Sequence, residues 1–122
     1  MPILDVEIIA SDSSQSLPAH LTQALADAAA KVFGTLQGRV WVKVHIIPPE
    51  HYAEDHGTPK GVQPVFVTVT KAKMPKGNAL EAEITQLTKS IASLLQRPET
   101  NVHITYQPDA AGRVAFGGRL VK

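Results

Sequence analysis

The residue of greatest chemical interest in the sequence is Pro2, which directly follows the initiator methionine. If Met1 is removed, Pro2 carries a secondary amine, a group that no side chain supplies. An α-amino group titrates at about pH 8, and burial or neighbouring cations lower its pKa towards neutrality, where a general base works best. Such a nitrogen could take up and return protons. The competing interpretation is that Pro2 only opens a strand, where a missing N–H breaks no ladder bond.

A base of this kind works with a cation that stabilises an oxyanion or holds a substrate carboxylate. The first candidates are Lys71 and Lys73, which lie two residues apart near the end of an expected strand and would share one face. A solvated strand end would explain the same two lysines. The other candidate cations are Arg39, Arg113 and Arg119.

Other chemical motifs in the sequence are weak. The stretch HYAEDH (51–56) holds two histidines and two carboxylates, but without an HExxH helix we expect a solvated loop and no metal site. The chain has no cysteine, which excludes disulfides, thiolate metal ligands and cysteine nucleophiles. It also lacks a phosphate-binding glycine motif and a nucleophile elbow.

Composition narrows the class of protein further. The 122 residues fit one compact domain, and a net charge of +1 with only three Phe, two Tyr and one Trp gives little for nucleic acid to bind. No apolar run approaches the roughly 20 residues that span a bilayer, and no secretory signal pattern opens the chain. We therefore expect a soluble cytoplasmic protein without nucleic-acid or membrane partners.

The first half of the chain predicts a strand, a helix and a strand. Residues 3–9 are short, apolar and β-branched, and 39–47 alternate between apolar and polar. Between them, apolar residues recur every three to four positions over 16–33, with Pro18 in the expected first turn and Gly34 just past the end.

The second half repeats this order. We expect strands at 64–73 and 101–107 and a helix over 78–96, which Asn78 and Glu81 would begin as a capping-box variant.

The two halves, 1–47 and 64–122, are joined by a loop at 48–63 that is rich in proline, glycine and charge. Two strand-helix-strand units with parallel strands predict a single α/β domain over 1–122, with a four-stranded mixed sheet and both helices on one face. The second face also reads as apolar. We therefore expect another subunit to cover it.

These features together resemble the tautomerase superfamily. The resemblance rests on MPILDVEII, the two β-α-β halves, VHIIP after the second strand and FGG near the C-terminus, and it covers nearly the whole chain. By length the chain resembles the fused, trimeric members. The resemblance implies a homotrimer and a cofactor-free keto–enol tautomerase, an isomerase acting on a small unsaturated 2-hydroxy or 2-oxo acid, with Pro2 as general base and acid.

The resemblance also implies which residues bind the substrate. Lys71 and Lys73 stand where decarboxylase and dehalogenase relatives carry a pair of arginines. His103 and Thr105 match positions that line the pocket from a neighbouring subunit. The remaining implied pocket residues are Trp41 and Phe116, although a strand histidine or a tryptophan is often structural.

Some positions depart from the family pattern. Asp12 stands where 4-oxalocrotonate tautomerase has an arginine, no acid lies beside Phe116 to activate water, and Gly38 replaces an aspartate of the decarboxylase. Decarboxylation, or hydration and dehalogenation, of a three-carbon acid is the alternative within the same scaffold. The alternatives outside it are a non-catalytic ferredoxin-like binding module and a tautomerase scaffold that has lost its chemistry.

Overall fold

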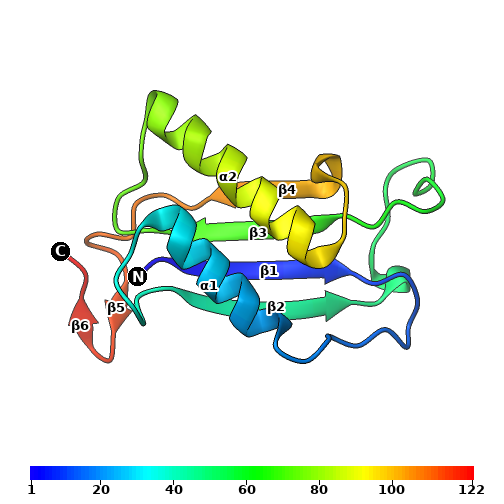
Figure 1. Cartoon of the computed structure of the whole chain (residues 1–122), viewed down its shortest axis with the longest axis horizontal. Coiled ribbons are helices and arrows are strands. Elements are labelled where there is room, and N and C mark those ends of the chain that lie inside the picture. The colour runs from blue at the N-terminus through cyan, green and yellow to red at the C-terminus, as the bar shows by residue number, and fades with distance from the viewer.

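The computed structural model describes residues 1–122 and shows a four-stranded sheet with both long helices on one face (Figure 1). In chain order the elements are β1 (Ile3–Ile9), α1 (Leu21–Phe33), β2 (Trp41–Ile47), the short 3-10 helix η1 (Pro49–His51), β3 (Val65–Thr70), α2 (Gly77–Leu95), the 3-10 helix η2 (Glu99–Asn101), β4 (Val102–Tyr106), β5 (Ala115–Phe116) and β6 (Arg119–Leu120).

The sheet has the order β2-β1-β3-β4. Each strand-helix-strand unit contributes one parallel pair, β1 with β2 and β3 with β4, and an antiparallel pairing of β1 with β3 joins the two units. The expected mixed sheet with both helices on one face is confirmed. The ferredoxin-like alternative is wrong for this fold, because two of the three strand pairings are parallel rather than antiparallel.

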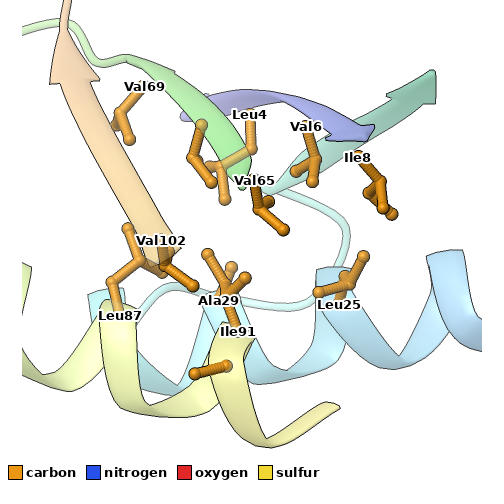
Figure 2. Packing of buried hydrophobic residues seen from close by; sticks show 12 residues of the cluster. Leu4, Val6, Ile8, Leu25, Ala29, Val65, Val69, Leu87, Ile91 and Val102 are labelled. Carbon is orange, nitrogen blue, oxygen red and sulfur yellow. The ribbon is translucent and has the colours of Figure 1, made fainter. Parts of the chain in front are cut away.

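The core lies between the sheet and the two helices (Figure 2). Side chains on β1 and β3 alternate, so that every second residue points towards the helices and is buried. Leu25 and Ala29 of α1 and Leu87 and Ile91 of α2 pack against that layer. Each fully buried Leu, Ile or Val contributes roughly 1.5–3 kcal/mol, so this layer fixes the strand register.

The first helix begins later than the sequence predicted. Pro18 lies before α1, which starts at Leu21 after His20, whose φ of 66° places it in the left-handed region. The expectation of a helix from residue 16 is therefore wrong at its start, because the chain makes a sharp turn at His20. The C-terminal end of α1 follows the expected pattern: Gly34, with φ of 64°, lies just past the last turn.

The second helix begins without the expected capping box. Gly77 is its first residue, and the N-cap position is Lys76, which makes no side-chain capping hydrogen bond. The capping role expected for Asn78 and Glu81 is wrong because both residues already lie inside the helix.

The second face of the sheet, which we call the open face, is more polar than the sequence suggested. Lys43 pairs with Asp5 at 3.0 Å, and Glu7 lies between His45 and Phe66 in the strand register. The expectation of an apolar second face is therefore wrong: polar and charged side chains stand among its apolar ones. The open face is formed by Ile3, Asp5, Glu7, Trp41, Lys43, His45, Phe66, Thr68, Thr70, His103 and Thr105.

Two features lie outside the main sheet. A hairpin of β5 and β6, which the sequence did not predict, lies near both chain termini (Figure 1). At the opposite end, the loop that holds HYAEDH carries several exposed side chains, and His56 contacts Asp55 at 3.0 Å. No helix is long and apolar enough to cross a membrane.

Candidate active site

Pro2 is held firmly at the start of β1. Its side chain is buried, with an exposed fraction below 2 %, and its carbonyl oxygen accepts a hydrogen bond from the Trp41 backbone N–H at 3.1 Å. In the chain that begins at Met1, the Pro2 nitrogen is part of a planar amide and has no basic lone pair. The free amine at this end is therefore that of Met1.

A cavity of about 360 Å³ surrounds this terminus. We call it the N-terminal cavity. It is assembled from four separate parts of the chain: the terminus itself, the turn leading into β2, the segment after β3, and the C-terminal hairpin region. Its lining residues are Met1, Gly38, Arg39, Trp41, Ala72, Phe116 and Val121.

The wall of the N-terminal cavity is aromatic on one side. The rings of Trp41 and Phe116 meet edge to face, with centroids 5.1 Å apart and an interplanar angle of 75°. This is a favoured geometry for an aromatic pair. Trp41 is nevertheless 52 % exposed, so its ring lines the cavity rather than filling the core. The two residues that the sequence suggested for the pocket are therefore brought together with the N-terminus.

The amine in this cavity is electrostatically perturbed. Partial burial, and secondly the positive charge of Arg39, hold the pKa of the Met1 amine below its ordinary value of 8.0. Both effects disfavour the ammonium form. The cavity thus combines an amine that gives up its proton readily with a guanidinium that can hold an anion.

Lys71 lies outside the lining of this cavity. It continues the buried side of β3, so its side chain lies under the helices, where the ammonium contacts Glu83 at 2.8 Å and lies 4.7 Å from the centre of the Phe33 ring. Tyr106 donates its hydroxyl to the other carboxylate oxygen of Glu83. Glu83 is distant from Lys71 in sequence but adjacent to it in space, so the sequence around Lys71 does not reveal this partner.

Lys71, Glu83 and Tyr106 form a cluster, and burial changes the pKa of its tyrosine. The pKa of Tyr106 lies above its ordinary value, first because of burial and then because its hydroxyl is hydrogen-bonded to Glu83. Tyr106 therefore remains a neutral donor. Lys71 and Glu83 are only 18 % and 11 % exposed at their side chains, so the ion pair is largely shielded from water.

The remaining sequence candidates, Lys73, His103 and Thr105, are not among the residues that line the N-terminal cavity. Lys73 is exposed in the segment after β3. His103 pairs with Phe66 in the register of β4 and β3, with ring centroids 5.5 Å apart, and Thr105 pairs with Thr68. Ile3, by contrast, pairs with Thr70 at the other end of β3. The substrate-binding roles of Lys73, His103 and Thr105 stay predictions.

Arg39 is the residue that sequence reasoning undervalued. The sequence offers Arg39 only as one of several candidate cations, after Lys71 and Lys73, which follow β3. The signal that could have found it is the parallel register of β1 and β2, in which Ile3 pairs with Trp41. That register brings residues just before Trp41 next to the N-terminus. Successive side chains of an extended chain point to opposite sides, which explains why Ala72, rather than Lys71, lines the N-terminal cavity.

Comparison with known proteins supports this architecture. No family model and no curated protein matches the sequence. Among solved structures, the chain is similar to Pt0534 inactivated by 2-oxo-3-pentynoate, with a TM-score of 0.72, 19% identity, and coverage of 97% of this chain and 94% of that one. It is similar to the R7 fused 4-OT asymmetric trimer, with a TM-score of 0.75, 18% identity, and coverage of 97% and 94%.

A third similar structure is the macrophage migration inhibitory factor of Oncomelania hupensis, with a TM-score of 0.75, 17% identity, and coverage of 100% of this chain and 83% of that one. At these identities the likeness establishes the fold. The chain has the tautomerase fold that its sequence suggested.

Proposed function

We propose that the chain is a cofactor-free keto–enol tautomerase that acts on a small unsaturated 2-hydroxy or 2-oxo acid once Met1 is removed. The observation that carries this proposal is the position of the chain's N-terminus in a cavity beside Arg39 and the Trp41–Phe116 pair. The fold shared with fused 4-OT and macrophage migration inhibitory factor supports it.

In the proposed reaction, the neutral Pro2 nitrogen takes the proton of the enol hydroxyl group. The resulting dienolate accepts a proton at carbon from the same nitrogen, so that one O–H bond is exchanged for one C–H bond with no net gain or loss. Arg39 pairs with the substrate carboxylate, and Trp41 and Phe116 exclude water around the conjugated chain. Burial, and secondly the nearby positive charge of Arg39, would favour the neutral form of the amine.

The class of substrate follows from the lining of the cavity. One guanidinium and two aromatic rings suit a small acid with one carboxylate and a planar unsaturated body. Pt0534, the protein of one similar structure, is inactivated by 2-oxo-3-pentynoate, which belongs to that chemical class. Hydration or decarboxylation is a weaker alternative, because no carboxylate lines the N-terminal cavity to activate water.

We further propose that the working form is a homotrimer. Fused 4-OT has been solved as symmetric and asymmetric trimers, and this chain shares its fold. The open face offers Phe66, Thr68 and the Asp5–Lys43 pair to a neighbouring copy. In such an assembly His103 and Thr105 would approach the Pro2 site of a different subunit.

The test compares two forms of the same chain, one with Met1 removed and one with Met1 retained, each verified by intact mass. Both are assayed for the ketonisation of phenylenolpyruvate. We expect activity in the processed form and a loss of at least about 100-fold in the other, because an amide nitrogen cannot act as a base.

A matched variant, Pro2→Ala, keeps a free primary amine of different basicity and geometry. We expect it to lose most of the rate while its circular dichroism and thermal midpoint show a folded protein. Equal rates for the processed and Met1-retained chains would contradict the proposal and reduce Pro2 to the first residue of a strand.

A further inference from the structure

A second cavity lies at the other end of the sheet from Pro2. It has a volume of about 480 Å³ and is enclosed by the segment before α1, the first turns of α1, the ends of β1 and β2, and the end of α2. We call it the distal cavity. None of its lining residues belongs to the N-terminal cavity, so the proposed function gives it no role.

The walls of the distal cavity are largely apolar. More than half of the lining residues are hydrophobic, and they come from both helices and both parallel strands of the first unit. Ile8 and Ile46 lie at the ends of the strands, Leu17 lies in the segment before α1, and Leu95 ends α2. Apolar surface of this kind gains free energy when a ligand's hydrocarbon displaces water from it.

One charged group, Arg97, lines the same cavity. Its guanidinium donates to the carbonyl oxygens of Gln63 at 2.6 Å and Ile9 at 3.1 Å, which fixes it in place. A guanidinium has five N–H donors, so three remain for another acceptor. No carboxylate forms an ion pair with Arg97. Burial lowers its pKa, in agreement with a cation that has lost water without gaining a counter-charge.

The beginning of α1 adds to the positive character of the distal cavity. His20, at the N-cap, makes no side-chain capping hydrogen bond, and the first turn of α1 contains no acidic residue. The partial positive charge of this helix end therefore has no local compensation. No acidic side chain lines the cavity. A fixed, unpaired guanidinium and apolar walls thus occur together in one cavity.

We propose that the distal cavity binds a small carboxylic acid with an apolar tail. The carboxylate pairs with the free N–H groups of Arg97, and the tail lies against Leu17, Leu95 and the ends of β1 and β2. A neutral molecule of the same length gains only the apolar contacts, and an amine places a second cation beside Arg97. The cavity therefore selects for the acid.

The experiment uses octanoate, octan-1-ol and octylamine as matched probes and follows backbone amide shifts of the full chain by NMR. We expect octanoate to produce saturable shifts at residues 17–24 and 94–97. Octanol should bind at least about 10-fold more weakly, the scale of one charge-assisted contact, and octylamine should produce no saturable shift at these residues. Tautomerase activity plays no part in this readout, so the result is independent of the proposed function.

Two variants identify the cavity. Arg97→Met should weaken octanoate binding at least about 10-fold, whereas Arg113→Met should leave it unchanged; Arg113 is the matched control because its guanidinium also donates to backbone carbonyls. If Arg97→Met does not fold, Ala19→Trp decides, because Ala19 is an exposed lining residue and a bulky ring there blocks the cavity.

Three results would overturn the proposal. The first is the absence of saturable shifts at residues 17–24 and 94–97 with 10 mM octanoate. The second is a set of shifts confined to the N-terminal cavity. The third is an octanoate affinity that is equal in the original chain and in a folded Arg97→Met or Ala19→Trp variant.

Discussion

Arg39 is the cation that lines the N-terminal cavity, and it gives the site two properties at once. Its charge can hold a carboxylate, and the same charge lowers the pKa of the amine that lies beside it. Lys71 does not line this cavity, and its ammonium group donates a hydrogen bond to the Glu83 carboxylate instead. At the scale of single residues, the site therefore depends on which cation faces the terminus.

We predict that Arg39→Leu lowers kcat/KM of the processed chain for phenylenolpyruvate at least about 10-fold, because one charge-assisted contact to the carboxylate is lost. Lys89→Leu is the matched control: it removes one positive charge from the exposed surface of α2 and should leave kcat/KM unchanged. Equal kinetics for Arg39→Leu and the unchanged chain would exclude Arg39 from substrate binding.

A second prediction concerns the Met1-retained chain. Its amine has a pKa below 8.0, with burial as the larger cause and Arg39 as the smaller. Arg39→Leu should therefore raise this pKa, yet leave it below 8.0 because burial remains. An NMR titration of the Met1 resonances measures both values. A pKa that is unchanged by the substitution would show that Arg39 does not act on the amine.

At the residue level, the sequence proposed Trp41 and Phe116 through the family resemblance, and the structure brings both rings to the N-terminal cavity. Their role in binding substrate stays a prediction. The sequence did not reveal the surroundings of Lys71, because its partner Glu83 lies twelve residues further along the chain in a helix, and no local pattern indicates that contact.

At the scale of elements, the cluster of Lys71, Glu83 and Tyr106 connects the residue that follows β3 with α2 and β4. All three side chains lie on the helix side of the sheet, next to the hydrophobic core. Removing one member leaves the others with unmet charge or hydrogen bonds in a place that water reaches poorly. The cluster therefore acts as a connection between the two layers.

We predict that Lys71→Met lowers the free energy of unfolding by about 2 to 4 kcal/mol, because it leaves the Glu83 carboxylate without its cation. The double variant Lys71→Met with Glu83→Leu should recover much of this loss. Urea unfolding of both variants measures the free energy of unfolding. For Lys71→Met, kcat/KM per folded molecule should change less than about twofold. A large fall in kcat/KM with unchanged stability would instead support the substrate-binding role predicted for Lys71.

Sequence periodicity located the elements better than their ends. The strand at 3–9 was predicted with the bounds that the structure gives, because the polar stretch SDSS, typical of a turn, follows its apolar, β-branched residues closely. The start of α1 was missed because the chain turns at His20, a residue whose positive φ has no sequence signature. The β5–β6 hairpin was missed because each strand has only two residues.

At the scale of the whole molecule, the open face is the surface through which we propose that copies of the chain associate. Its centre holds Thr68 of β3, paired with Asp5 on one side and Thr105 on the other. The face also presents apolar rings, among them Phe66, to solvent in the single chain. Such a mixed surface is typical of an interface that combines apolar contact with polar selection.

We predict a homotrimer at micromolar concentration, measured by light scattering. Thr68→Arg should shift the population towards monomers, because each copy then carries an added cation at the centre of the open face. Gln86→Arg is the matched control, since it adds the same charge on the exposed surface of α2 and should leave the trimer intact. A stable monomer of the unchanged chain would contradict both the trimer and the shared site of His103.

The two chain ends lie at the same side of the molecule, next to the C-terminal hairpin (Figure 1). Val121, the penultimate residue, even lines the N-terminal cavity. This arrangement matters for protein engineering, because an affinity tag fused to either end would crowd the cavity, and one at the N-terminus would also acylate Pro2. The loop around Gly57 and Lys60 lies at the opposite end and is exposed, which makes it the better place for an inserted tag or label.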